Sequence, residues 1–108
     1  MNILFVCSRN RWRSPTAEAI YKNRPSLNVR SAGTEPSARI KISSRDVEWA
    51  DLIFVMEKRH KERLKDKYSH QLDEKRVVVL EIEDEYQFMD QVLIEMIKIT
   101  VDPFLEGI

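Results

Sequence analysis

The sequence places one cysteine and one arginine at a spacing that suits phosphate chemistry. Cys7 is followed by five residues and then by Arg13 and the hydroxyl residue Ser14. A loop of this length can turn its backbone N–H groups toward one point, and such a nest binds an anion. The planar guanidinium of Arg13 can grip two oxygens of a phosphoryl group. The same positive surroundings favour the thiolate form of cysteine, so Cys7 is predicted to be a nucleophile.

Two predicted elements flank this loop and would hold it in place. Residues 1–7 form a nearly continuous apolar run, which is typical of a central parallel strand covered on both faces. Ser14 and Pro15 predict the start of a helix, with Ser14 as its cap. In α/β folds ligands collect beyond the carboxyl ends of the strands, and Cys7 is the first such position in this chain.

Further strands and helices are predicted to alternate along the rest of the chain. The expected elements are an edge strand over 27–32, a short helix capped by Ser43 or Ser44, a strand over 51–56, a charged helix over 57–68, a strand over 76–80, a helix capped by Asp90, and a tail over 101–108. The last helix would bury Val92, Leu93, Met96, Ile97 and Ile99. This alternation predicts one domain over residues 1–108, with a three-layer α/β fold and a parallel sheet of about four strands.

Composition excludes several classes of protein. The 18 Lys and Arg residues balance 18 Asp and Glu residues, which argues against a nucleic-acid-binding domain. One cysteine cannot form an internal disulfide or a zinc cluster, and we expect no metal and no cofactor. With two glycines, the chain contains neither a Walker-type phosphate loop nor a dinucleotide fingerprint. The N-terminus lacks a basic leader and no apolar run approaches about 20 residues, so we expect a cytoplasmic protein that does not bind membranes.

The loop and its surroundings resemble the low-molecular-weight protein tyrosine phosphatase family. The family's loop reads Cys-x-Gly-Asn-x-Cys-Arg-Ser-Pro and is followed by a helix that contains Ala-Glu. The matching residues in this chain are Cys7, Asn10, Arg13, Ser14, Pro15, Ala17 and Glu18. The resemblance continues in the same order through residues 31–34, 37–39 and 50–56, and so covers most of the chain.

This resemblance implies a cysteine-dependent phosphatase. Cys7 would attack the phosphorus and form a cysteinyl-phosphate, while Arg13 would bind the equatorial oxygens. An aspartic acid would protonate the leaving group, and water would then hydrolyse the intermediate. The hydroxyl of Ser14 would hydrogen-bond the thiolate and help it leave. The implied partner is a phosphorylated protein or a small aryl phosphate, and we expect a monomer or a weak dimer.

The remaining loop residues would bind the phosphoryl group and shape the pocket. They are Ser8, Arg9, Asn10, Arg11 and Trp12, with Ser31 supporting Asn10. In place of the family's glycine, apolar residue and second cysteine, this chain has Arg9, Arg11 and Trp12. A side chain at position 9 would restrict the loop if a positive φ were needed there. The segment between Gly33 and Ala50 is also shorter than in the family, which predicts a shallower pocket.

Two aspartates are candidates for the general acid. The family's acid lies in an Asp-Pro-aromatic motif, and Asp102-Pro103-Phe104 matches it literally. In the family, however, the acid loop follows the fourth strand and precedes the last helix. Asp84 lies at that point of the chain, with Tyr86 two residues later. The order of elements therefore favours Asp84 and leaves Asp102 as the alternative.

Two other functions are compatible with these residues. The loop arginines would also suit a non-catalytic module that binds phosphorylated partners. An arsenate reductase is a further alternative, although with one cysteine it would need an external thiol. His60 and His70 lie in or after the charged helix, and we assign both to the surface.

Overall fold

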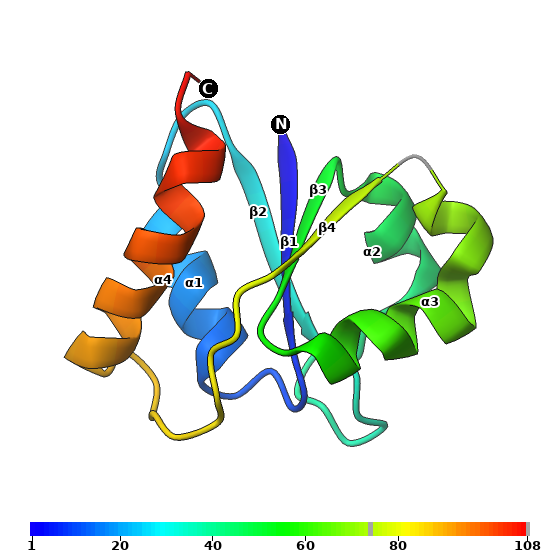
Figure 1. Ribbon diagram of the computed structural model, residues 1–108, viewed down its shortest axis with the longest axis horizontal. Coiled ribbons are helices and arrows are strands. Elements are labelled where there is room, and N and C mark those ends of the chain that lie inside the picture. Colours follow the sequence, from blue (N-terminus) through cyan, green and yellow to red (C-terminus); the bar gives the residue numbers. More distant parts are fainter. Residues whose placement is uncertain (74, 108) are drawn as a thin grey trace.

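The computed structural model describes residues 1–73 and 75–107, in which strands and helices alternate (Figure 1). The elements in chain order are β1 (Asn2–Cys7), α1 (Arg13–Tyr21), β2 (Asn28–Gly33), α2 (Ser44–Trp49), β3 (Leu52–Val55), α3 (Lys58–Leu72), β4 (Arg76–Val79) and α4 (Gln91–Leu105). The four strands of this part of the chain form one parallel sheet in the order β2-β1-β3-β4. The predicted α/β fold is confirmed.

Helices cover both faces of the sheet and make the three layers that the sequence predicts. α1 and α4 lie on one face, and α2 and α3 lie on the other (Figure 1). Alternate residues of β1 serve the two cores, because Phe5 and Cys7 face α1 and α4 whereas Leu4 and Val6 face α2 and α3. All four side chains are buried, which explains why β1 is apolar from Ile3 to Cys7.

The order of the strands reverses at β1. The chain passes from β1 to the edge strand β2 and then crosses back to β3 on the other side of β1. The loops that follow β1 and β3 therefore diverge and leave room for a ligand at this edge of the sheet. Each strand brings a residue to the same edge: Cys7 ends β1, Gly33 ends β2, Glu57 follows β3, and Asp84 follows β4.

The start of α1 differs from the prediction. Ser14 is not the helix cap, because α1 begins at Arg13, and Trp12 occupies the cap position without a side-chain hydrogen bond. The buried hydroxyl of Ser14 is instead directed into the loop that precedes the helix. The caps predicted for the other helices are confirmed, since Ser43 caps α2 and Asp90 caps α4.

The last helix is longer than predicted, because residues 101–105 continue it rather than forming a tail. Pro103 lies inside α4, where a proline costs about 3 kcal/mol. Val101 and Leu105 are fully buried, and each such side chain contributes about 1.5–3 kcal/mol, so the helix continues. Residue 108 lies outside the described part of the chain.

The apolar face of α4 is also rotated relative to the predicted stripe. Leu93 and Ile97 are fully buried as predicted, whereas Val92 and Ile99 are exposed. Within residues 1–73 and 75–107, no helix combines the length and the apolar character that crossing a membrane requires.

Candidate active site

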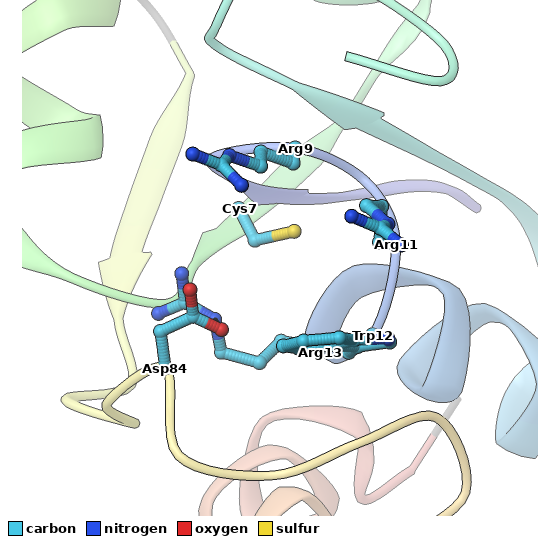
Figure 2. Close-up of a pocket in the computed structure, with 6 residues that line it drawn as sticks. All are labelled: Cys7, Arg9, Arg11, Trp12, Arg13 and Asp84. Carbon is cyan, nitrogen blue, oxygen red and sulfur yellow. Dashed lines mark ion pairs between the residues drawn. The ribbon is translucent and has the colours of Figure 1, made fainter.

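Cys7 lies in a pocket at the carboxyl edge of the sheet (Figure 2). The pocket is lined by Cys7, Arg9, Arg11, Trp12, Arg13 and Asp84. Arg9 and Arg11 stand on one side of the sulfur and Asp84 stands on the other (Figure 2). Residues 8–12 curl around Cys7, which is only 2% exposed.

The carbonyl groups of this loop are bonded away from the pocket, to the segment that follows β2. The bonds run from Thr34 N to Cys7 O (3.0 Å), from Glu35 N to Ser8 O (2.9 Å), from Arg39 N to Arg9 O (3.0 Å), and from Arg39 Nε to Asn10 O (3.0 Å). The approach is close because Gly33 lacks a side chain: a Cβ there would lie 2.6 Å from Ser8 O.

The amide groups of the loop face the other way. In a trans peptide the N–H of one residue points opposite to the carbonyl of the residue before it. None of the N–H groups of residues 8–12 donates to an acceptor within the described chain. Together with the first turn of α1, these amides form a positive nest that suits a tetrahedral anion.

The loop residue with a left-handed backbone conformation is Asn10 rather than Arg9. Asn10 has a φ of 55°, a conformation that asparagine tolerates better than most residues. Arg9 is exposed and stands at the rim of the pocket. Arg9 does not have a positive φ, so the restriction that such a φ would have imposed at position 9 does not arise.

A directed chain of hydrogen bonds ends at the cysteine. The carboxylate of Glu18 accepts a hydrogen bond from the hydroxyl of Ser31 at 2.6 Å. The two hydrogens of Asn10 Nδ2 are then donated to Ser31 Oγ at 2.9 Å and to Ser14 Oγ at 2.8 Å. Ser14 Oγ lies 3.0 Å from Cys7 Sγ, and its own hydrogen can reach the sulfur. The chain therefore delivers a hydrogen-bond donor to a Cys7 thiolate.

Arg13 is fixed by the loops that follow β3 and β4. Its guanidinium, 1% exposed, donates from Nη1 to Glu57 Oε2 at 2.6 Å and to the carbonyl of Ile82 at 2.9 Å. Its Nε lies 3.6 Å from Asp84 Oδ1. Burial tends to raise the pKa of Glu57, but hydrogen bonds from Arg59 and Arg13 outweigh burial and lower that pKa. Arg13 is thus held by an ionised carboxylate, and within the described residues only its Nη2 has no partner.

His60 is buried beside the loop, and its assignment to the surface was wrong. Its Nδ1 accepts the N–H of Glu57 at 3.0 Å, so the proton of the neutral ring is on Nε2. Nε2 lies 2.9 Å from the hydroxyl of Ser8, to which it can donate. Burial, followed by the charges of Arg13 and Arg59, lowers the pKa of His60 to about 4. A neutral His60 therefore supports the loop.

The two candidate aspartates lie in different places. Asp84 lines the pocket and its side chain is 47% exposed. Asp102 lies on α4, away from the residues that line the pocket, and accepts a hydrogen bond from the hydroxyl of Tyr21 at 2.6 Å. Burial and this hydrogen bond both raise the pKa of Tyr21. Of the two, only Asp84 can touch a molecule bound over Cys7.

Sequence reasoning missed Glu57, His60 and Arg39 as parts of the site. His60 carries a signal that could have revealed it, because Leu64 and Tyr68 follow at intervals of four residues along one face of α3. Both of those side chains are buried with it. Glu57 and Arg39 carry no comparable local signal, since their partners in the loop lie 44 and 29 residues away in the chain.

A family comparison covers the segment that contains the loop. Residues 2–43 match the sequence model described as low molecular weight phosphotyrosine protein phosphatase. This segment includes β1, the loop with Cys7 and Arg13, α1 and β2. No curated protein sequence matches the chain significantly.

Solved structures similar to this chain extend over nearly its whole length. The tyrosine phosphatase Wzb from Escherichia coli K30, in complex with phosphate, is 21% identical, with 99% of this chain and 97% of that chain covered and a TM-score of 0.80. The YwlE arginine phosphatase from Geobacillus stearothermophilus is 20% identical, with 97% and 90% covered and a TM-score of 0.77. A low molecular weight phosphotyrosine phosphatase from Vibrio cholerae O395 is 23% identical, with 100% and 99% covered and a TM-score of 0.70. These likenesses show the fold, and with the family match they confirm the resemblance seen in the sequence.

Proposed function

We propose that this chain, whose residues 2–43 match the family model of the low molecular weight phosphotyrosine protein phosphatases, is a cysteine-dependent phosphomonoester hydrolase. Its main support is the position of the Cys7 sulfur beneath loop amides that have no acceptor in the described chain. The hydroxyl of Ser14, 3.0 Å from the sulfur, and the buried guanidinium of Arg13 complete the surroundings of a phosphoryl group. Donors fixed in advance stabilise the charge that develops in phosphoryl transfer.

The reaction would proceed in two displacements. The Cys7 thiolate attacks the phosphorus, an S–P bond forms, and the P–O bond to the leaving group breaks. Asp84 gives its proton to the leaving oxygen, and Arg13 with the loop amides binds the equatorial oxygens. Water then attacks the cysteinyl-phosphate and yields its proton to Asp84, while the S–P bond breaks. Ser14 donates its hydrogen bond to the departing thiolate.

An aryl phosphate fits the pocket mouth better than a phosphorylated arginine does. One similar structure is that of a tyrosine phosphatase and another that of an arginine phosphatase, so both substrate classes occur among proteins with this fold. In this chain Arg9 and Arg11 stand at the mouth of the pocket. They would repel the cationic guanidinium of a phosphoarginine, whereas the ring of a phosphotyrosine is uncharged and can pack on Trp12.

The first test is replacement of the nucleophile. Cys7→Ser should abolish hydrolysis of para-nitrophenyl phosphate, because a serine hydroxyl is a far weaker nucleophile than a thiolate. Inorganic phosphate should still bind, as measured by calorimetry, because the amides and Arg13 are unchanged. Turnover that survives the substitution would reject the assignment of Cys7. A wild-type protein that binds phosphate without turnover would instead be a phosphate-binding module.

The second test separates the two candidate acids. Asp84→Ala should slow cleavage of phenyl phosphate by roughly 10²- to 10⁴-fold, the usual contribution of a positioned general acid. The loss should be smaller for para-nitrophenyl phosphate, whose leaving group needs less protonation. Asp102→Asn is the matched control and should leave both rates unchanged, since its partner is Tyr21. A loss of activity in Asp102→Asn and not in Asp84→Ala would reverse the assignment.

A further inference from the structure

A second groove continues from the phosphate pocket along α1. Its lining residues are Arg11, Pro15, Glu18, Ala19, Lys22, Arg39 and Phe88. Arg11 also lines the pocket over Cys7, so the two cavities share a wall. Arg11 lies against Trp12, with its guanidinium carbon 5.4 Å from the ring centroid. A substrate polypeptide whose phosphoryl group enters the pocket can therefore extend into the groove past Arg11.

The groove carries an excess of positive charge. Arg11, Lys22 and Arg39 form no ion pair with any carboxylate in residues 1–73 and 75–107. Glu18 is the acidic residue of the lining, and its carboxylate already accepts the hydroxyl of Ser31. Three cations thus line the groove against one carboxylate, which accepts a hydrogen bond from Ser31.

The opposite rim of the pocket carries the opposite charge. Asp84 stands across the sulfur from Arg11 (Figure 2). The exposed loop around Asp84 also includes Glu81, Glu83 and Glu85. The surface around the pocket is therefore basic on the side of the groove and acidic on the side of the loop that follows β4. Such a surface orients a charged ligand and discriminates between flanking charges.

We propose that the groove binds an acidic segment next to the phosphorylated residue of a polypeptide substrate. This inference rests on the proposed function and specifies its substrate. Carboxylates of the segment would pair with Arg11, Lys22 and Arg39. Phe88, which is 52% exposed, would contact the apolar part of the same segment. A basic segment in this position would meet like charges, so the arrangement also rejects the wrong substrate.

The test compares phosphotyrosyl peptides that differ in their flanking charges. The peptides of one set carry three aspartates and those of the other set carry three lysines. In each set the charged residues lie before the phosphotyrosine in one peptide and after it in another. At low salt the preferred aspartate peptide should have a kcat/KM roughly tenfold or more above that of its lysine counterpart, and salt should reduce the difference. Equal values for the two sets, or a preference for lysine, would overturn the inference.

A charge reversal in the groove locates the effect. Lys22→Glu should lower kcat/KM for the aspartate peptide by roughly three- to tenfold, because an attraction is replaced by a repulsion. Its activity on para-nitrophenyl phosphate should not change, because Lys22 does not line the pocket over Cys7. Lys98→Glu, an exposed change on α4, is the matched control and should leave the peptide preference intact.

Failure of the inference and failure of the proposed function give different results. Without any turnover of para-nitrophenyl phosphate the proposed function fails, and affinity for the aspartate phosphopeptide then replaces kcat/KM as the measurement. A loss of that affinity in Lys22→Glu would still support the groove. If Lys22→Glu weakened binding to vesicles of mixed phosphatidylcholine and phosphatidylserine but left the peptides unaffected, the groove would face a membrane and the inference would be wrong.

Discussion

Lowering the pH should destabilise this protein through His60, and the size of the effect follows from the surroundings of the ring. His60 is 1% exposed, and its Nδ1 accepts the backbone N–H of Glu57. A second proton would have to sit on Nδ1, where it would displace that N–H. Burial, and then the charges of Arg13 and Arg59, lowers the pKa of the ring to about 4, although the nearby carboxylate of Glu57 partly opposes them.

The sign and the magnitude follow from proton linkage. In the unfolded chain the pKa of His60 is near 6.5, so the ring binds a proton at pH values where the buried ring stays neutral. The free energy of unfolding therefore falls as the pH drops from about 6.5 to about 4. Each pKa unit corresponds to about 1.4 kcal/mol, which gives a total loss of about 3 kcal/mol. About 2 kcal/mol of this loss should already be present at a pH of about 5, before most carboxylates titrate.

Urea unfolding followed by circular dichroism, at several pH values between 7 and 5, would measure this loss. In His60→Gln the loss over the same pH range should be smaller by about 2 kcal/mol, because the amide does not titrate. His70→Gln is the matched control, since His70 is exposed, and it should keep the wild-type pH dependence. The reasoning would be refuted by the same pH dependence in the wild type and in His60→Gln.

Two further substitutions test how the loop is held. Glu57→Gln keeps an acceptor for Arg13 but removes the charge. The free energy of unfolding in urea titrations should therefore fall by about 1–2 kcal/mol, a modest loss because Glu57 is partly exposed. An unchanged stability would contradict the role of Glu57 in anchoring Arg13. Gly33→Ala places a Cβ 2.6 Å from both Ser8 O and Ala38 Cβ, so the loop must shift. Stability should fall by about 1–3 kcal/mol and kcat/KM for para-nitrophenyl phosphate should fall with it, whereas retention of both would show that the loop adapts freely.

Local signals in the sequence were sufficient for the sheet and for the core of the loop. The apolar run over residues 1–7 predicts β1 because a strand buried on both faces cannot alternate. The Cys7 to Arg13 spacing, read together with that strand and the helix after it, identifies the loop. The order of elements places Asp84 rather than Asp102 near the pocket, against the more literal motif match.

The parts that sequence reasoning missed depend on contacts between distant segments. Glu57 and Arg13 lie 44 residues apart, and only the sheet topology brings the ends of β1 and β3 together. Ser14 resembles a helix cap because serine is common at that position before a proline, yet its hydroxyl contacts Cys7, Asn10 and Ala32 instead. The tail predicted over residues 101–108 is likewise helical as far as Leu105, because burial of Val101 and Leu105 overrides the local cost of Pro103.

Because the carbonyls of residues 7–10 are held by the segment after β2 rather than by a ligand, the amide nest exists before any anion arrives. A loop whose carbonyls are fixed in this way needs little reorganisation to bind an anion. The proposed hydrolysis would leave inorganic phosphate bound to the same amides. Where phosphate or sulfate is abundant, a fraction of the molecules would hold such an ion and could not bind substrate. The total rate would therefore fall as the concentration of free oxyanion rises.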